Sequence, residues 1–342
     1  MVGAERAYSR GMKVTYKNLE YLKEVTRTPR PEWFTENEII LDHPAFLLRE
    51  FQRGPDTIVI VPPQAGHASC IADYDDQQSL VQTAAKSGRG VYAIDWKSCP
   101  RERKGETLED LVNQVYAALE PFDEPVTLIG LCQGGWLAAT FTALFPHRVS
   151  ELIVAGAPIN AKAGGGHIQN LVGILPQSYY EQMVIWGGGT MRGEFMLFGW
   201  KMMNPIERMQ DYIDLWHATG TAKFRKLQKF RDWYEYTQDL AGVWYLQAVD
   251  RIFRRNDLWE GRLELFGEPV RFSNITCPVV SIAGENDDIT LIPQALALPG
   301  THVTIPDVGH IGIFMSKKSQ PYWEKILVKE EICPEKHVIC ST

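Results

Sequence analysis

Several short runs of apolar residues, in which polar residues do not alternate with the apolar ones, occur along this chain. Runs of this kind suit strands that are buried on both faces, as in a parallel sheet, because neither face has to meet water. Six such runs predict six strands: TIVIV (57–61), GVYAID (90–95), VTLIGL (126–131), ELIVA (151–155), PVVSIAG (278–284) and THVTIP (301–306).

Helical patterns lie between several of these runs. In the segment 107–120, apolar residues recur at helical spacing and form one stripe, which predicts an amphipathic helix. The segment 135–145 predicts a second helix that stops at Pro146, and the segment 319–330 predicts a closing helix. Strands that alternate with helices indicate an α/β fold with a doubly wound, mostly parallel sheet.

The alternation breaks between residues 161 and 270. This stretch holds six of the ten tryptophans and six of the nine methionines, and its pattern predicts helices and loops rather than strands. An insertion after a middle strand of such a sheet is typical of a cap domain, and we expect some of its aromatic residues to wall a cleft. The predicted organisation is an N-terminal arm (1–37), a core (38–160 and 271–330), a cap (161–270) and a tail (331–342).

Composition narrows the functional classes. The net charge of −7 and the pI of about 5.7 argue against a nucleic-acid partner. The N-terminal segment lacks an apolar signal-peptide region and no stretch reaches 18 apolar residues, so we expect a cytoplasmic protein without a transmembrane segment. The six cysteines show no metal-ligand spacing and fit reduced thiols.

The segment GLCQGG (130–135) follows one predicted strand and precedes a predicted helix. Its frame Gly130-x-Cys132-x-Gly134 has the spacing of the nucleophile elbow, G-x-S-x-G, with cysteine at the centre. Small residues are needed two positions before and after the nucleophile, because its strained backbone leaves no room for larger ones. The motif therefore predicts an α/β-hydrolase fold with Cys132 as nucleophile.

A thiol nucleophile needs a base and an acid that orients it, in the chain order nucleophile, acid, histidine. Asp287 and Asp288 come directly after the fifth predicted strand, and His310 follows the sixth. Open α/β sheets place their sites at these carboxyl ends. We expect His310 to be the base and Asp287 the acid, with Asp288 as the alternative, and we expect no metal.

An oxyanion hole requires two backbone N–H donors. Gln133, directly after the nucleophile, is expected to supply one donor. The loop after the first predicted strand should supply the other, and because Pro62 and Pro63 have no N–H, the candidates are Gln64 and Ala65. His67 in the same loop and Trp136 in the elbow helix are candidate substrate-binding residues.

The chain also resembles a known group of proteins. GLCQGGWLA (130–138) is similar to the lipase-like box of polyhydroxyalkanoate synthases, which also use cysteine. The segments PQAGHA (63–68), AGAPIN (155–160), GENDDI (284–289) and VGHIGIF (308–314) look like those of intracellular polyhydroxybutyrate depolymerases. The similarity covers roughly residues 30 to 330. It implies that Cys132, Asp287 and His310 act together on 3-hydroxyacyl esters.

Two departures place the chain between the two groups. It has Gly134 and Gly135 where the depolymerases have proline, and it has Asp288 where the synthases usually have histidine. The resemblance favours an ester hydrolase that cleaves poly(3-hydroxyalkanoate) or its oligomers through an acyl-thioester intermediate. The alternative is a synthase that transfers acyl groups from 3-hydroxyacyl-coenzyme A.

We expect no bound cofactor, with coenzyme A as a candidate acyl acceptor or leaving group. The expected partner is a polyester or hydroxyacyl ester substrate. A polymer granule surface and a second copy of the chain are further candidate partners.

Overall fold

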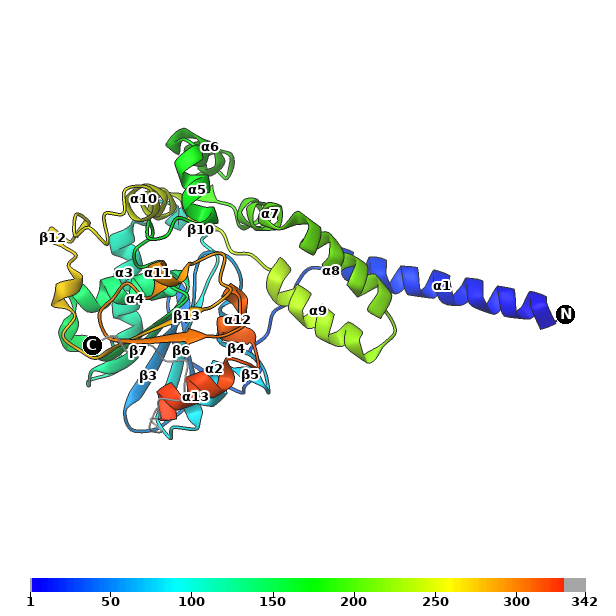
Figure 1. Ribbon diagram of the computed structural model, residues 1–342, viewed down its shortest axis with the longest axis horizontal. Coiled ribbons are helices and arrows are strands. Elements are labelled where there is room, and N and C mark those ends of the chain that lie inside the picture. Colours follow the sequence, from blue (N-terminus) through cyan, green and yellow to red (C-terminus); the bar gives the residue numbers. More distant parts are fainter. Residues whose placement is uncertain (1, 329–342) are drawn as a thin grey trace.

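The computed structural model describes residues 2–328, with side chains from residue 14 onward. Its centre is a twisted sheet of eight strands with helices on both faces (Figure 1). The strands follow the order β1 (Glu38–Asp42), β2 (Phe46–Gln52), β6 (Gly90–Trp96), β3 (Thr57–Val61), β7 (Val126–Leu131), β8 (Val149–Ala155), β13 (Val279–Gly284) and β14 (Thr301–Ile305).

All six predicted strands are confirmed, and the six are parallel to their neighbours among themselves. Strand β3 shows why its apolar run does not alternate. Val59 and Val61 belong to the hydrophobic core on one face of the sheet, whereas Ile58 and Ile60 belong to the core on the other. A strand in the middle of a doubly covered sheet has no polar face.

Strands β1 and β2 were not predicted from the sequence. They pair antiparallel with each other, and β2 pairs antiparallel with β6 at the edge of the sheet. Only Phe46 and Leu48 of β2 are fully buried, so the two strands lack the continuous apolar run on which the prediction relied.

The core helices cover the sheet from two sides. One side carries α3 (Leu108–Leu119) and α4 (Gln133–Leu144), and the other carries α2 (Leu80–Ala85), α12 (His310–Met315) and α13 (Gln320–Val328). The predicted helices at 107–120 and 135–145 are confirmed as α3 and α4. The predicted helix at 319–330 begins as α13 at Gln320, and its last two residues, like the predicted tail 331–342, lie outside the described part of the chain.

The long connection between β8 and β13 is helical, as predicted. Helices α5, α6 and α10 lie over the carboxyl edge of the sheet, whereas α7 and α8 lead away from it and α9 returns (Figure 1). The short strands β9 (Thr190–Met191) and β10 (Leu240–Ala241) pair with each other at the two ends of the segment that contains α7, α8 and α9. The helices are α5 (His167–Ile174), α6 (Gln177–Trp186), α7 (Gly193–Met203), α8 (Pro205–Ala218), α9 (Ala222–Glu235) and α10 (Gly242–Gln247).

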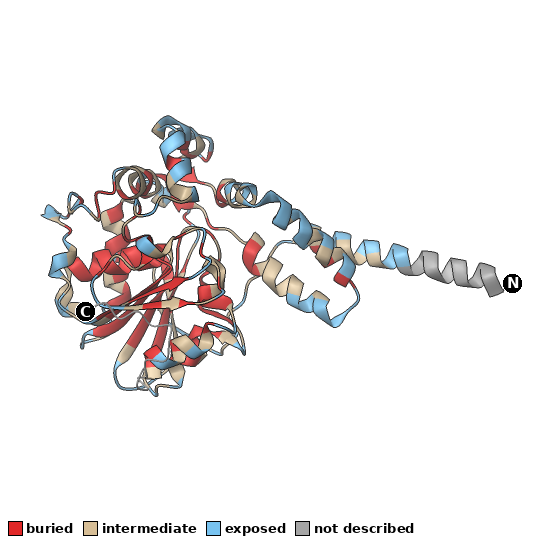
Figure 2. Cartoon of the chain, in the orientation of Figure 1, coloured by how far each residue is buried: buried red, intermediate tan, exposed pale blue. Residues whose placement is uncertain are grey.

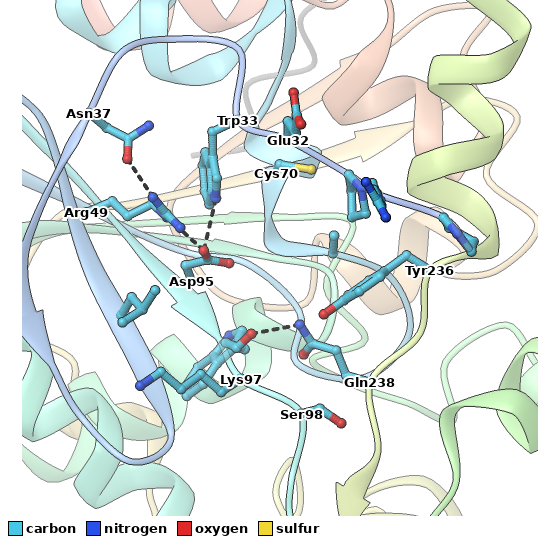
Figure 3. Close-up of a pocket in the computed structure, with 16 residues that line it drawn as sticks. Glu32, Trp33, Asn37, Arg49, Cys70, Asp95, Lys97, Ser98, Tyr236 and Gln238 are labelled. Atoms are coloured by element: carbon cyan, nitrogen blue, oxygen red, sulfur yellow. Dashed lines mark hydrogen bonds and ion pairs between the residues drawn. The ribbon is translucent and has the colours of Figure 1, made fainter. Parts of the chain in front are cut away.

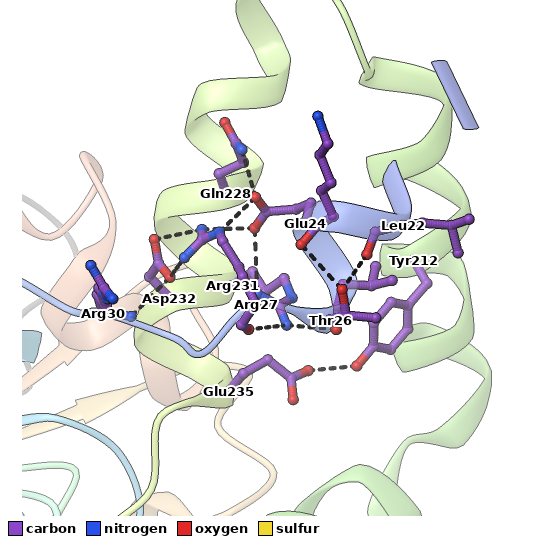
Figure 4. Close-up of polar contacts among 12 residues, drawn as sticks. Leu22, Glu24, Thr26, Arg27, Arg30, Tyr212, Gln228, Arg231, Asp232 and Glu235 are labelled. Atoms are coloured by element: carbon purple, nitrogen blue, oxygen red, sulfur yellow. Dashed lines mark hydrogen bonds and ion pairs between the residues drawn. The ribbon is translucent and has the colours of Figure 1, made fainter. Parts of the chain in front are cut away.

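The N-terminal helix α1 (Val2–Thr26) projects beside α8 and α9, away from the sheet. Polar contacts fix its end to α9 (Figure 4). Arg27 pairs with Asp232, with Nη2 at 2.8 Å from Oδ2, and the buried Glu24 accepts a hydrogen bond from Gln228 at 2.6 Å. In this projecting part, α8 is mostly exposed and α9 is mostly half-buried, whereas the central strands of the sheet are buried (Figure 2).

Candidate active site

The cysteine of the elbow sits where β7 ends and α4 begins. Cys132 has a φ of 51° and a ψ of −120°, a conformation that L-residues rarely adopt. Its N–H donates to Ala155 O at 2.8 Å, which links the turn to strand β8. The strained backbone is held by this packing and lifts the side chain at the carboxyl edge of the sheet.

The glycines around Cys132 are needed for close packing. A Cβ atom on Gly130 would lie 2.5 Å from both Gly134 O and Gly135 Cα. A Cβ atom on Gly134 would collide with Val61 O of the neighbouring strand. Helix α4 can therefore start directly beneath the turn only because these positions lack side chains.

The other two predicted residues meet the cysteine at this edge. His310 begins α12 after β14, and Asp287 lies in the loop after β13. His310 Nε2 is 3.1 Å from Cys132 Sγ, and His310 Nδ1 is 2.8 Å from Asp287 Oδ2. The arrangement has the geometry of a nucleophile, a base and an acid that orients the base.

Asp287 is held in a fixed position for this contact. Its side chain is buried, and Oδ1 accepts the N–H groups of Ile289 and Thr290, both at 2.9 Å. Oδ2 is thereby left to face His310. Asp288, the alternative acid, is exposed and lies 3.5 Å from Asn204 Nδ2 instead. The structure thus brings Asp287, and not Asp288, to the histidine.

The electrostatic environment of His310 favours its protonated form. Burial acts to lower the pKa of His310, but the negative charges of Cys132 and Asp287 and the hydrogen bonds to both raise it well above its ordinary value. The thiolate is the form of cysteine that attacks as a nucleophile, and a neighbouring imidazole that readily holds a proton favours that form.

The two candidates for the second oxyanion donor differ in whether their backbone N–H is already hydrogen-bonded. Gln64 N–H donates to Oε1 of the Gln133 side chain at 2.7 Å, so this N–H is already engaged. The N–H of Ala65 has no acceptor among the described residues, and neither does that of Gln133, which opens helix α4. Ala65 and Gln133 are therefore the pair available to an oxyanion.

The Gln133 side chain itself was not predicted to take part. It joins the elbow to the loop 62–67 and so fixes the peptide that precedes Ala65. Gln133 Nε2 and Gln64 Oε1 are both buried without a hydrogen-bond partner in the described chain. An arrangement optimised for stability alone would not leave two such atoms, since each costs about 1–3 kcal/mol.

The two candidate substrate-binding residues are placed differently. His67 packs against the rings of Trp233 and Tyr234 of α9, with centroids 4.6 and 4.8 Å away. Burial lowers its pKa to about 4, partly offset by a hydrogen bond with Tyr236 O, so the ring is neutral near neutral pH. Trp136 is buried in α4, and its indole N–H has no partner among the described residues. His67 thus joins the loop 62–67 to the inserted helices.

The aromatic residues of the insertion divide into two groups. Trp233 and Trp244 are buried, whereas Trp186 of α6 and Phe198 of α7 are about 71% and 66% exposed. Trp233 and Tyr234 of α9 contact His67 in the loop 62–67, whereas α7 and α8 lead outward (Figure 1). That aromatic residues of this stretch wall a cleft above the site stays a prediction.

The described residues contain neither a cluster suited to a metal ion nor a helix suited to cross a membrane. Within residues 14–328, no group of three or more histidine, cysteine, aspartate or glutamate side chains is placed to hold a metal ion. None of the helices described is long and apolar enough to cross a membrane.

Comparisons with known proteins identify a family and several relatives in sequence. A family model described as "Protein of unknown function (DUF3141)" matches residues 36–299. A Poly(3-hydroxyalkanoate) polymerase subunit PhaC from Synechocystis is 26% identical over 93% of this chain and 91% of its own length. A protein of the same name from Haloferax mediterranei is 27% identical over 83% of this chain and 61% of its own length.

Solved structures show the same architecture at low identity. The monoacylglycerol lipase of Paleococcus ferrophilus superimposes with a TM-score of 0.52 at 13% identity, covering 82% of this chain and 96% of that one. At this identity the likeness concerns the fold. Together with the parallel sheet and the elbow, it confirms the predicted α/β-hydrolase fold.

Proposed function

We infer that this chain, which belongs to the DUF3141 family, is an acyltransferase that moves 3-hydroxyacyl groups from a coenzyme A thioester to a hydroxyl acceptor through Cys132. The observation that carries the proposal is the contact of Cys132 Sγ with His310 Nε2 at 3.1 Å, in a chain similar to proteins named polymerases. The resemblance in sequence favours hydrolysis, and the comparisons favour transfer.

The first step forms an acyl-enzyme. The Cys132 thiolate attacks the thioester carbon, and the oxyanion accepts hydrogen bonds from the N–H groups of Gln133 and Ala65. The bond to the coenzyme sulfur then breaks, and the departing thiolate takes the proton of His310. The product is a thioester on Cys132, close in energy to the substrate because one thioester replaces another.

The second step releases the acyl group. Neutral His310 takes the proton of a hydroxyl acceptor, whose oxygen attacks the acyl carbon on Cys132. An oxygen ester forms, the bond to Sγ breaks, and the sulfur departs as the thiolate beside the newly protonated imidazole. Asp287 stabilises the imidazolium and holds its Nδ1–H in both steps. If the acceptor is the hydroxyl end of a hydroxyacyl chain, each cycle lengthens a polyester by one unit.

Hydrolysis is the second candidate function, and two features of the sequence favour it. The chain has Asp288 after the acid and the PQAGHA loop before the elbow, both as in the depolymerases that it resembles. With water as acceptor, the same residues would cleave polyhydroxybutyrate or its oligomers. The two reactions share the acyl-enzyme and differ in the acyl donor and acceptor.

One experiment separates the two. The purified full chain is incubated with 3-hydroxybutyryl-coenzyme A and, separately, with amorphous polyhydroxybutyrate. Transfer predicts free coenzyme A together with polymer or oligomer, and no acid from the polymer. Release of 3-hydroxybutyrate or its oligomers from the polymer, without consumption of the thioester, would replace transfer by hydrolysis. Inertness toward both substrates would refute the two candidates together.

A further inference from the structure

A cavity of about 770 Å³ opens at the carboxyl end of β6 (Figure 3). Five separate parts of the chain enclose it: the segment 29–37 that follows α1, Leu47 and Arg49 of β2, Ala68 with Cys70, the end of β6 with residues 95–98, and residues 236–238 that follow α9. Its volume lies within the range of small-molecule sites, about 300–1,000 Å³. Cys132 does not line it, and it has no part in the chemistry described above.

One wall of the cavity is fixed by charges that satisfy each other. Asp95 Oδ2 accepts Arg49 Nε at 2.7 Å and the indole N–H of Trp33 at 3.1 Å. Arg49 Nη1 also donates to Asn37 Oδ1 at 2.7 Å. These bonds tie the segment 29–37 to the sheet, so the cavity is part of the fold rather than a gap beneath a loose segment.

The opposite wall carries an acceptor without a donor. Gln238 is 2% exposed, and its Nε2 donates to Trp96 O at 2.7 Å, which fixes the orientation of the amide. Gln238 Oε1 is buried and has no partner among the described residues. An unsatisfied buried acceptor costs about 1–3 kcal/mol, so a ligand N–H or O–H would be favoured here.

The remaining lining combines rings with a free cation. Trp33 and Tyr236 supply aromatic surface, and the Tyr236 hydroxyl points toward the Gln238 amide (Figure 3). The exposed side chains of Arg30 and Glu32 also line the cavity, and neither has an ion-pair partner in the part of the chain described. A ligand with apolar surface, at least one N–H or O–H donor and an anionic end that reaches Arg30 fits this lining.

We propose that this cavity binds the coenzyme part of the acyl donor, a chain of amides and hydroxyls that ends in phosphates. The inference rests on the function proposed above. The repeat units of a polyester carry only hydrogen-bond acceptors, so they offer nothing to Gln238 Oε1. The amide N–H groups of a pantetheine arm do, and a phosphate is a partner for the Arg30 guanidinium.

The position of the cavity relative to the nucleophile suits this assignment. Strands β6, β3 and β7 are consecutive in the sheet and parallel, so the ends of β6 and β7 lie at the same edge. Two strand spacings separate them by about 10 Å. The loop 62–67, which carries the Ala65 donor, lies between, and a pantetheine arm is long enough to pass from the cavity to Cys132.

Titration calorimetry on the full chain tests the proposal with four probes: coenzyme A, pantetheine, adenosine 3′,5′-bisphosphate and a linear trimer of 3-hydroxybutyrate. We expect the coenzyme to bind and Gln238→Met to weaken its affinity and that of pantetheine about tenfold, the effect of one lost hydrogen bond. Arg30→Glu should weaken the coenzyme and the bisphosphate at least tenfold and pantetheine much less.

Arg225→Glu, an exposed position on α9 outside the cavity, is the matched charge control. Thermal melts show whether the Gln238→Met variant folds. If that variant does not fold, Arg30→Glu still tests the proposal, because Arg30 lies on the surface and its substitution should leave the fold intact. Unchanged coenzyme affinity in Arg30→Glu, or displacement of the coenzyme by the trimer, would overturn the assignment. Turnover of 3-hydroxybutyryl-coenzyme A by the wild-type chain, measured separately, shows whether the proposed function stands when the cavity assignment fails.

Discussion

The elbow between β7 and α4 and the hairpin of α8 and α9 differ in how closely the protein surrounds them. At the elbow, a single Cβ atom on Gly134 would meet the backbone of β3. On α7 and α8, Phe198, Ile206 and Met209 are each at least 60% exposed. The elbow keeps its conformation because the surrounding backbone leaves no space for an added atom. The hairpin has open space around it, so its position depends on the few segments that it contacts.

The contrast shows which features of the molecule are tied to its chemistry. Strain and crowding at Cys132 hold the thiol at 3.1 Å from His310, where small displacements would matter. The two helices of the hairpin are joined to each other by polar contacts such as Tyr212 with Glu235 at 2.6 Å, and Asp232 of α9 pairs with Arg27 at the end of α1 (Figure 4). The hairpin carries apolar side chains such as Ile206 outward. Substitutions in the two regions should therefore differ in size and in kind.

The largest effect is expected at the nucleophile. Cys132→Ala should lower acyl transfer by roughly 10⁶-fold, as removal of a nucleophile does in enzymes of this design, while the fold is retained. Cys132→Ser should keep a trace of activity. The measurement is coenzyme A release, with circular dichroism for folding, and Cys277→Ala, away from the site, is the control. Full activity of Cys132→Ala would refute the nucleophile.

The acid should rank second. Asp287→Asn is expected to lower the rate by about 10⁴-fold, because the histidine then loses the group that orients it. Asp288→Asn is the matched substitution, and its exposed side chain makes no contact with His310. Steady-state kinetics of both variants give the comparison, and a larger loss in Asp288→Asn would move the role to that residue.

The oxyanion loop should show an intermediate effect. Gln133→Met keeps the backbone donor but removes the acceptor for Gln64 N–H, so Ala65 loses its fixed position. We expect kcat to fall by about 10²-fold, the effect of one oxyanion donor, with KM little changed. The rate of Cys132 alkylation by iodoacetamide needs no oxyanion hole and should stay near the wild-type rate. Gln64→Met, which removes a side-chain amide whose buried Oε1 has no partner among the described residues, should cost much less, and equal losses in both variants would contradict this role.

Two glycine substitutions, one at the elbow and one on the outward helix α7, compare the two regions through the free energy of unfolding. Gly134→Ala should lower the free energy of unfolding by about 3 kcal/mol, because the added Cβ overlaps Val61 O. Gly199→Ala, in the middle of α7 with open space around it, should raise the free energy by about 0.5–1 kcal/mol. Urea unfolding of the two variants measures both, and the same sign for both would show that the contrast in packing does not govern stability.

The smallest effect on stability is expected on the outward helices α7 and α8. Phe198→Ser and Ile206→Ser should change the free energy of unfolding by less than about 0.5 kcal/mol, because both side chains are exposed. Activity on polymer particles should nevertheless fall more than activity on a short soluble ester, since apolar surface is what an insoluble substrate would contact. Equal activity losses on the two substrates would assign these residues to the fold alone.

Much of the core could be predicted from local patterns. The run TIVIV gave β3 because a strand covered on both faces can have no polar side, and GLCQGG gave the elbow because crowding admits only glycine beside the nucleophile. The proximity of Cys132, Asp287 and His310 followed from one rule, that parallel strands bring their carboxyl ends to one edge. Each of these features depends on a short segment and a general constraint.

Other features depended on contacts between distant segments. The edge strands β1 and β2 are only partly buried, so their residues carried no strong pattern. The choice of Ala65 over Gln64 depended on a hydrogen bond between residues 69 positions apart, and the choice of Asp287 over Asp288 on which carboxylate faces His310. The direction of the hairpin and the cavity behind Trp33 arose from the packing of α1 and the segment 29–37. A sequence determines what a segment must avoid, such as water on a buried face or a side chain in a crowded turn, whereas only the folded chain determines which of several suitable partners each polar group meets.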